Sequence, residues 1–349
     1  MTSSASPVGI GVIGLGRGFV LMLPAFRADR RVRLVAACAP REESRAAFRT
    51  EFGGNAYPDV ESLCADPEVE IVYVATPHEL HCEHVIAAAK AGKHVFVDKP
   101  IAITLEDATR MVEACREAGV QLIVGPSHSF DAPVALARQL IESGDHGRVR
   151  MINAFNYTDF LYRPRRPEEL NTEKGGGVLF SQGVHQIDIV RLLAGGMAEK
   201  VFAMTGKWDP TRPTEGAYSA LVSFAGGVFA SLTYSGYAHF DSDEWMGWTG
   251  ELGNEKDPKA YGDARRKLKS VSSEDEIKLK SARTYGSGDM PKPASRYEHF
   301  GPIIVSCDRA DLRLTPEGVH VYGDTEREFR AAPDLLYPRK EVIDAVVAT

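Results

Sequence analysis

Short apolar runs alternate with amphipathic stretches in the first third of the chain. The apolar runs are rich in valine and isoleucine and span Val8–Ile13, Val32–Cys38, Ile71–Ala75, His94–Val97 and Leu122–Val124. Between them, helical periodicity covers Phe19–Arg27, Arg41–Phe52, Glu79–Ala91 and Leu105–Ala118. Strands that alternate with helices of this length form parallel βαβ units. Residues 1–125 are therefore predicted to form a doubly wound α/β domain of the dinucleotide-binding, Rossmann type.

The pattern changes after residue 125, where β-branched and aromatic residues alternate with polar ones. Strands are expected at Val149–Tyr157, Lys200–Trp208, Tyr218–Phe224, Val228–Tyr234, Ile303–Val305 and Leu312–Leu314, with a helix over Ser181–Leu193. Gly226 and Gly227 separate two of these runs and favour a hairpin turn. Residues 126–349 are therefore predicted to form an α+β domain with a mostly antiparallel, open sheet. An open face would be an exposed apolar patch unless another subunit covered it, which favours a homodimer or homotetramer.

Within this second domain, residues 241–293 are polar, weakly periodic and of mixed charge, and are expected to be a solvated excursion. The whole chain of 349 residues is 44% hydrophobic, as in an ordinary globular protein, and its net charge of −7 argues against nucleic acid or an anionic membrane as main partner. Five cysteines without a CxxC pair argue against disulfides and a zinc site. Met1–Pro7 does not resemble a leader peptide, and no apolar run approaches the roughly 20 residues of a membrane span. The sequence thus favours a cytoplasmic protein that binds no metal and acts on a small molecule.

The turn after the first apolar run contains Gly14, Gly16, Arg17, Gly18 and Phe19. A strand, a glycine-rich turn and a helix cradle a phosphate, because the backbone approaches the pyrophosphate closely and the helix N-terminus favours negative charge. The usual third glycine is replaced by Phe19, and Gly18 comes one position early. Gly14 and Gly16 still meet the two physical needs, so the turn is predicted to bind a dinucleotide rather than to be a plain connection.

The end of the second run bears on the choice between NAD and NADP. A carboxylate there would accept hydrogen bonds from the ribose hydroxyls of NAD, but the position is Ala39. Arg41 could bind the 2′-phosphate of NADP, or it could lie in water at the start of the next helix. We expect NAD as the cofactor and leave NADP open.

Asp98 and Lys99 follow the run His94–Val97 and precede a proline. This setting fixes the direction of the Lys99 side chain. A lysine fixed in this way can exchange a proton with a substrate hydroxyl while a hydride moves to a nicotinamide. The alternative is a surface lysine at the edge of the sheet. Together with the glycine-rich turn, Lys99 predicts a nicotinamide-dependent oxidoreductase.

Residues around this lysine resemble the glucose–fructose oxidoreductase, inositol dehydrogenase and rhizopine-catabolism family. The resemblance rests on Thr76, Pro77, His81, the run Ala91–Val95 and Asp98–Pro100, although the family usually has Glu in place of Asp98. It implies that Thr76, Pro77, His81, Asp98 and Lys99 contribute to cofactor binding. Members of the family often continue beyond the helical pattern in which this chain stops, so the chain is expected to be short at its C-terminus.

Three glycines, Gly175–Gly177, precede Ser181, His185 and Asp188 and resemble the second signature of that family. Residues spaced i, i+4 and i+7 share one face of a helix. Histidine exchanges protons near neutral pH, so His185 is expected to act as acid or base or to hold a hydroxyl. Asp188 is expected either to orient His185 or to serve packing. The family commonly has Asp at Ser181, and its loss would suit an anionic substrate.

Arg163, Arg165 and Arg166 lie just before this helix, in an otherwise acidic chain. Arginine forks bind carboxylates through two parallel hydrogen bonds. The arginines are therefore expected to line the substrate site together with Tyr157 and His128. The alternatives are a solvated basic loop and salt bridges between subunits.

At finer grain, residues 156–169, 175–196, 208–215 and 235–248 resemble the phthalate 4,5-cis-dihydrodiol dehydrogenase branch of the family. This resemblance implies NAD-dependent oxidation of a dicarboxylate, 4,5-dihydro-4,5-dihydroxyphthalate, to a catechol. Two rival functions stay open. One is a sugar or inositol dehydrogenase of the same family, which a neutral polar pocket would favour. The other is a regulatory protein that binds the dinucleotide without turnover, which the loss of an acid at Ser181 would favour.

Overall fold

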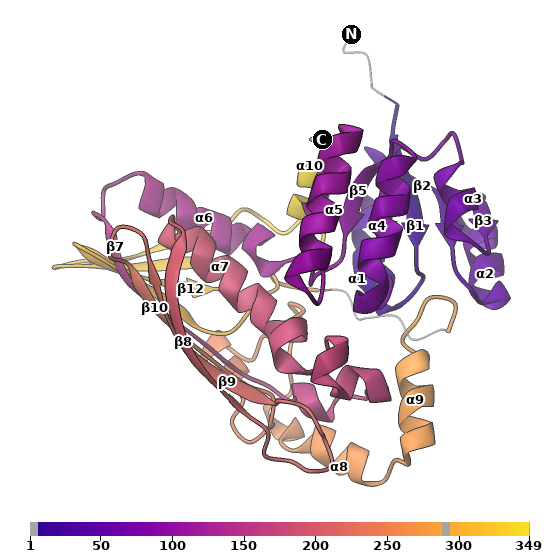
Figure 1. Cartoon of the computed structure of the whole chain (residues 1–349). Coiled ribbons are helices and arrows are strands. Elements are labelled where there is room, and N and C mark those ends of the chain that lie inside the picture. The colour runs from indigo at the N-terminus through magenta and orange to yellow at the C-terminus, as the bar shows by residue number, and fades with distance from the viewer. Residues whose placement is uncertain (1–5, 288–293, 349) are drawn as a thin grey trace. The chain divides into compact units, whose positions relative to one another are not determined.

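The computed structural model describes residues 6–287 and 294–348, which fold into two compact units (Figure 1). Among these described residues, the first unit comprises 6–126, 278–287 and 339–348, and the second comprises 127–277 and 294–338. The first boundary lies next to the expected division at residue 125, but two later segments return to the first unit. The expected excursion at 241–293 is thus divided between the units. Its last residues, 288–293, and residues 1–5 of the chain's polar start lie outside the described ranges.

The first unit contains a six-stranded parallel sheet in the order β3-β2-β1-β4-β5-β6. Its strands are β1 (Val8–Ile13), β2 (Val32–Cys38), β3 (Asn55–Tyr57), β4 (Ile71–Val74), β5 (His94–Val97) and β6 (Leu122–Val124). Its helices are α1 (Arg17–Ala28), α2 (Glu42–Phe52), α3 (Val60–Cys64), α4 (His81–Lys90), α5 (Leu105–Ala118) and α10 (Lys340–Val347), with a 3₁₀ turn η1 (His78–Leu80). The doubly wound fold predicted for this part is confirmed. In such sheets ligands bind at the carboxyl ends of the strands where the order reverses, here between β1 and β4.

Helix α5 shows why the elements of this unit begin and end where they do. The Thr104 hydroxyl accepts a hydrogen bond from the Asp107 N–H at 3.0 Å and caps the start of the helix. The helix ends at Gly119, whose φ of 67° places it in the left-handed region that favours glycine. Its buried Met111 and Cys115 join the core between the sheet and α4.

The second unit contains an eight-stranded sheet in the order β14-β13-β12-β11-β7-β10-β9-β8. Its strands are β7 (Val149–Tyr157), β8 (Ala198–Gly206), β9 (Ala217–Phe224), β10 (Phe229–Ser235), β11 (Ile303–Cys307), β12 (Ala310–Thr315), β13 (Gly318–Gly323) and β14 (Arg327–Ala331). Strands β7 and β10 are parallel, and the other neighbouring pairs are antiparallel. The mostly antiparallel sheet is confirmed, as is the hairpin at Gly226 and Gly227, both with a φ of 85°.

The remaining elements of this unit include short helical turns that carry candidate site residues. Its α-helices are α6 (Ala132–Glu142), α7 (Val184–Ala194), α8 (Asp263–Lys269) and α9 (Ser273–Ser281), the last of which runs past the boundary at residue 277. Its other turns are η2 (His128–Phe130), η3 (Phe160–Tyr162), η4 (Pro167–Leu170), η5 (Thr172–Lys174), the π-helical turn η6 (Leu179–Gly183), η7 (Ser242–Met246) and η8 (Pro258–Ala260). No helix in the described ranges is long and apolar enough to cross a membrane.

The two faces of the eight-stranded sheet differ in what covers them. Helices α6 and α7 lie along one face (Figure 1), where Ile189 of α7 packs into the same core as Leu232 of β10. On the opposite face, Phe202, Leu221 and Phe229 are each more than half exposed. We call this uncovered side of the sheet the outer face.

Gly177, the last of the three glycines before η6, is required by close packing in the second unit. Gly177 has a φ of 83°, and a Cβ at this position would lie 2.1 Å from Oε1 of Glu215. Glu215 is buried and accepts hydrogen bonds from the Leu179 N–H at 3.1 Å and from the Thr214 hydroxyl at 3.0 Å. The glycine signature thus places the buried carboxylate that holds the start of the helix carrying His185.

Replacing Gly177 with Ala should therefore lower the free energy of unfolding by at least ~2 kcal/mol, because it combines a strained φ with a clash against a buried carboxylate. Gly144→Ala is the matched control, since Gly144 has a φ of 76° with no atom within 4 Å of the added methyl. Equal losses in urea denaturation of the two variants would show that the Glu215 contact contributes nothing.

Candidate cofactor and catalytic site

The turn between β1 and α1 is shaped to hold a phosphate. Gly14 has a φ of 95°, and a Cβ there would lie 2.7 Å from the Ala75 carbonyl oxygen. Gly16 precedes α1, and a Cβ there would meet nothing closer than 3.8 Å, so the space over the helix start is open. The first N–H groups of a helix have no intrahelical acceptor and attract an anion. The residues of the turn therefore fit the pyrophosphate of a dinucleotide.

Gly18 and Phe19, the next residues of α1, serve packing. A Cβ at Gly18 would lie 2.3 Å from Oδ2 of Asp98, so glycine lets the helix approach the end of β5. Phe19 is fully buried, and its ring meets Tyr285 edge-on at 5.2 Å. The expectation that Phe19 contacts the cofactor is corrected for its side chain, which belongs to the core. Arg17 lies half-buried in the same first turn.

Ala39 follows the end of β2, and two arginines lie beside it, one of which, Arg45, pairs with Glu42 at 2.6 Å. Ala39 is buried, and its carbonyl accepts a hydrogen bond from Nη1 of Arg45 at 2.6 Å. Arg41 precedes α2 and donates from Nη2 to the Thr284 hydroxyl at 2.7 Å. Arg45 was not expected here from the sequence, although it lies one turn after Arg41 and hence near the same strand end.

Asp98 and Lys99 follow β5 on the same edge of the sheet. The Asp98 carboxylate accepts a hydrogen bond from the Lys99 backbone N–H at 2.8 Å, which fixes the start of the Lys99 turn. Burial raises the pKa of Asp98, against the opposing effect of Lys99 and His81. Asp98 is thus a positioning group in contact with α1 and with the lysine's own backbone.

His81 connects the ends of β4 and β5. Its Nε2 lies 2.9 Å from the Thr76 carbonyl oxygen and its Nδ1 lies 2.9 Å from that of Pro100. The ring is completely buried, so it holds the Lys99 turn in place from beneath the surface. Thr76 is half-buried and Pro77 is exposed beside it, where a cofactor can reach both.

His185 lies in the first turn of α7, directly after the π-helical turn that carries Ser181. The His185 ring is buried and meets the His128 ring edge-on at 4.7 Å and the Phe300 ring at 5.3 Å. Ser181 is half-buried. The structure therefore brings together His185 and His128, two of the residues proposed from the sequence for the substrate site.

Asp188 bonds to the turn that carries His128. Its Oδ2 accepts hydrogen bonds from the hydroxyls of Ser127, at 2.9 Å, and Ser129. Its Oδ1 accepts a hydrogen bond from Arg191 at 3.2 Å. These contacts tie η2 to α7, which favours the structural alternative for Asp188 over direct orientation of His185.

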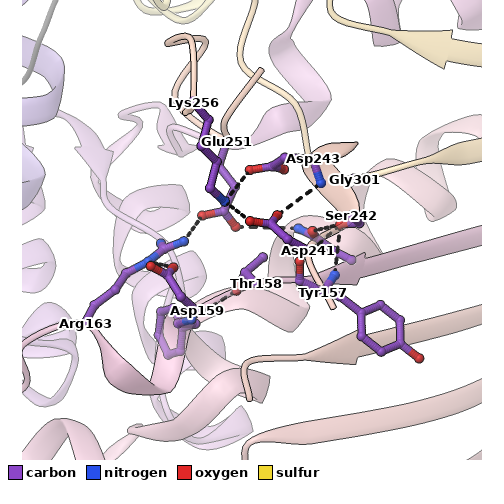
Figure 2. Close-up of polar contacts among 12 residues, drawn as sticks. Tyr157, Thr158, Asp159, Arg163, Asp241, Ser242, Asp243, Glu251, Lys256 and Gly301 are labelled. Atoms are coloured by element: carbon purple, nitrogen blue, oxygen red, sulfur yellow. Dashed lines mark hydrogen bonds and ion pairs between the residues drawn. The ribbon is translucent and has the colours of Figure 1, made fainter. Parts of the chain in front are cut away.

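Two of the three expected substrate arginines have carboxylate partners in their own unit. Arg163 donates to Asp159 at 2.7 Å and to Glu251 at 2.6 Å (Figure 2). Arg165 pairs with Glu169 at 3.6 Å and stacks on the Phe160 ring, and burial lowers its pKa to about 10. Arg166 makes no side-chain ion pair among the described residues and is half-buried. Arg163 and Arg165 are thus engaged by carboxylates of their own unit, whereas Arg166 stays a candidate for binding a substrate carboxylate. Partners as distant along the chain as Glu251 leave no local signal in the sequence.

Tyr157 lies on the outer face of the sheet. Its neighbour Asn156 is fully buried, and side chains alternate between the faces of a strand. Tyr157 lines a cavity of about 480 Å³ together with Trp208, Tyr237 and Arg265. Helix α7 covers the other face, so the expectation that Tyr157 joins His185 in one substrate site is corrected by the register of β7.

Comparison with known proteins agrees with this architecture. Residues 8–126 match an oxidoreductase family with an NAD-binding Rossmann fold, and residues 134–254 match the GFO/IDH/MocA C-terminal domain. The chain belongs to this GFO/IDH/MocA oxidoreductase family. It is an enzyme of the NAD-dependent oxidoreductase class, with NAD as the cofactor of its first domain.

Relatives of known name or structure show the same organisation. The chain is 49% identical over 343 residues to 1-carboxy-3-chloro-3,4-dihydroxycyclohexa-1,5-diene dehydrogenase of Comamonas testosteroni, covering 96% of this chain and 86% of that protein. A crystal structure from Bordetella bronchiseptica RB50 superposes with a TM-score of 0.92 at 42% identity, covering 97% of this chain and 89% of that one. Levoglucosan dehydrogenase in complex with NADH and levoglucosan shares the fold, with a TM-score of 0.68 at 22% identity over 96% of this chain and 82% of that one.

Arg163→Ala should lower the free energy of unfolding by about 1–3 kcal/mol, because it leaves the Glu251 carboxylate, only 11% exposed, without its cation. Arg166→Ala is the matched variant and should leave stability unchanged. Chemical denaturation of both proteins checks this. A stable, fully folded Arg163→Ala protein that lost only its affinity for a carboxylated substrate would return Arg163 to the substrate site.

Proposed function

We propose that the protein oxidises a ring-carboxylated cis-dihydrodiol to the corresponding catechol with NAD. The observation that carries the proposal is the 49% identity, over 96% of the chain, to a dehydrogenase whose substrate is a carboxylated dihydroxycyclohexadiene. The finer proposal, from the resemblance to the phthalate branch, is that the diol is 4,5-dihydro-4,5-dihydroxyphthalate, a dicarboxylate.

The reaction balances with the groups that the chain supplies. NAD, when bound, accepts a hydride from one carbinol carbon. Lys99 or His185 accepts the proton of the hydroxyl on that carbon, which leaves a carbonyl group. The hydroxy-enone then moves a ring proton to oxygen and becomes aromatic, and this step favours the forward direction. Lys99 lies in the first unit and His185 in the second, so each remains a separate candidate for the base.

Charge near the candidate site supports an anionic substrate. Ser181 stands where the family commonly has an acid, which removes one negative charge from beside His185. Arg166 makes no side-chain ion pair among the described residues and is the arginine proposed to meet a carboxylate. One such arginine can bind one ring carboxylate, so a monocarboxylate substrate fits this charge at least as well as a dicarboxylate. A neutral polyol would gain nothing from this charge, so the sugar or inositol dehydrogenase is the second candidate.

The end of β2 keeps NADP open as a second cofactor. NAD-selective domains place a carboxylate at this strand end, which would repel a 2′-phosphate. Here the position is Ala39, and Arg41 and Arg45 lie beside it.

The test is to measure kcat/KM by reduced-cofactor absorbance with NAD and with NADP for matched substrates. These are the phthalate cis-dihydrodiol, a monocarboxylate cis-dihydrodiol, an uncarboxylated cis-dihydrodiol and myo-inositol. A carboxylated diol with NAD should exceed the uncarboxylated diol by about 10-fold or more, the difference expected for one partly desolvated charge pair. A preference for inositol would favour the second candidate, and absence of turnover with all four would favour the regulatory alternative.

A variant at Lys99 tests the proton-transfer step. Lys99→Ala should lower kcat far more than it weakens NAD binding, because the lysine is proposed to act on the substrate hydroxyl. Turnover near that of the unaltered enzyme would remove Lys99 from the mechanism and leave His185 as the base.

We also propose that a second copy of the chain covers the outer face and makes the protein a homodimer or homotetramer. Phe202 and Met204 on edge strand β8 are 70% and 69% exposed, and large apolar patches mark contact sites. Phe202→Glu should shift the protein to a smaller species in sedimentation velocity. Leu105→Glu, at a residue 89% exposed on α5, is the control and should leave the species unchanged. A monomeric unaltered protein at micromolar concentration would contradict the proposal.

A further inference from the structure

Asp131 and His128 form a buried hydrogen-bonded pair next to His185. Nδ1 of His128 donates to Oδ2 of Asp131 at 2.8 Å, and the side chains are 9% and 11% exposed. Asp131 is the residue before α6, and His128 lies in η2, so the bond spans three residues of one tight turn. A carboxylate that accepts from one ring nitrogen of a histidine fixes both the tautomer and the plane of the ring.

Further charged groups surround this pair. Burial alone would lower the pKa of His128, but the carboxylates of Asp131, Glu298 and Glu251 outweigh it and raise that pKa above its ordinary value. His299 is a further histidine nearby, and burial lowers its pKa to about 4, so it adds no cation at neutral pH. His128 is therefore the group of this cluster whose charge the acids favour.

The His128 ring is in direct contact with the His185 ring. The two rings meet edge-on at 4.7 Å, and Phe300 packs against both, at 5.4 Å from His128 and 5.3 Å from His185. Asp188 of α7 accepts hydrogen bonds from the residues on either side of His128, Ser127 and Ser129. The His128 ring is thus fixed by Asp131 from one side and by α7 through its backbone turn.

We propose that Asp131 and His128 act as positioning residues for His185, with Asp131 fixing the His128 ring and the His128 ring fixing the plane and electrostatic surroundings of His185. This inference rests on the proposed function only in taking His185 as a group that touches the substrate. The pair lies outside α7 and gives His185 an ordered, charged neighbour. Ser181 stands where the family commonly has an acid.

The same atoms admit a different occupant, which the experiment must separate. Ligand-type atoms of His128, Asp131 and Glu298 all lie within 4.8 Å of one another, a spacing that a divalent cation could also use. The 2.8 Å contact between His128 and Asp131 fits an N–H···O⁻ hydrogen bond without a metal.

The experiment compares Asp131→Asn, Asp131→Glu and the exposed control Asp145→Asn in two measurements. Histidine-ring NMR titration of the protein without substrate should show the His128 midpoint falling by about one pH unit or more in Asp131→Asn, with the His185 signals moving as well. With a substrate that the unaltered enzyme turns over, kcat of Asp131→Asn should fall about 10- to 100-fold with KM for NAD unchanged. The acid limb of its pH profile should also move, Asp131→Glu should restore part of the activity, and Asp145→Asn should match the unaltered enzyme.

Each other outcome counts against the proposal in a distinct way. If the His128 midpoint falls in Asp131→Asn while the His185 signals and the pH profile stay fixed, the pair is merely structural and the proposal is wrong. Stoichiometric Zn²⁺ or Mg²⁺ binding in calorimetry that is lost in His128→Gln would make the cluster a metal site instead. Absence of turnover in the unaltered protein would refute the proposed function, and the NMR titration would still decide whether the pair controls His185.

Discussion

One close contact governs the cofactor half of this enzyme, namely the approach of Gly18 in α1 to the Asp98 carboxylate at the end of β5. The contact leaves no room for a Cβ, which would lie 2.3 Å from that carboxylate. It sets how near the phosphate-binding end of α1 lies to the turn that carries Lys99. The Asp98 carboxylate accepts a hydrogen bond from the Lys99 N–H, and His81 contacts the Thr76 and Pro100 carbonyls, so the ends of β4 and β5 are joined to each other and lie against the start of α1. The displaced glycine of the sequence, Gly18, is explained by this packing.

The second unit is organised around charges that neutralise one another away from water. Arg212, with a side chain 5% exposed, pairs with Glu276 at 2.7 Å, and Arg163 pairs with Glu251 at 2.6 Å. Lys256 pairs with Asp243 at 2.9 Å, although burial still raises the pKa of Asp243 to about 7 (Figure 2). Breaking a buried pair costs more than forming it contributes, so such pairs fix the geometry of the loops more than they stabilise the fold. The loop before α7 that carries Arg163 is thus bonded to Glu251, a residue of a segment that follows α7 in the chain.

The sequence predicted well whatever depends on neighbours along the chain. Most strands of the two sheets, the hairpin at Gly226 and the helix carrying His185 follow from periodicity of two or 3.6 residues. Strands β13 and β14 were not predicted. Short elements such as β3, with three residues, give too few periods to be recognised. Roles set by distant partners could not be predicted. Arg163 looked like a substrate ligand because nothing nearby showed that Glu251, 88 residues later, would bind it. Asp131, by contrast, lies three residues after His128 and could have been found from that spacing.

In the proposed reaction, a hydride passes from a carboxylated cis-dihydrodiol to NAD. The most direct measurement uses a carboxylated diol with deuterium on the carbinol carbons, incubated with enzyme in excess and NAD, followed by mass spectrometry of both products. We expect one deuterium in the reduced cofactor for each catechol formed. Reduced cofactor without deuterium, or catechol formed without reduced cofactor, would contradict it.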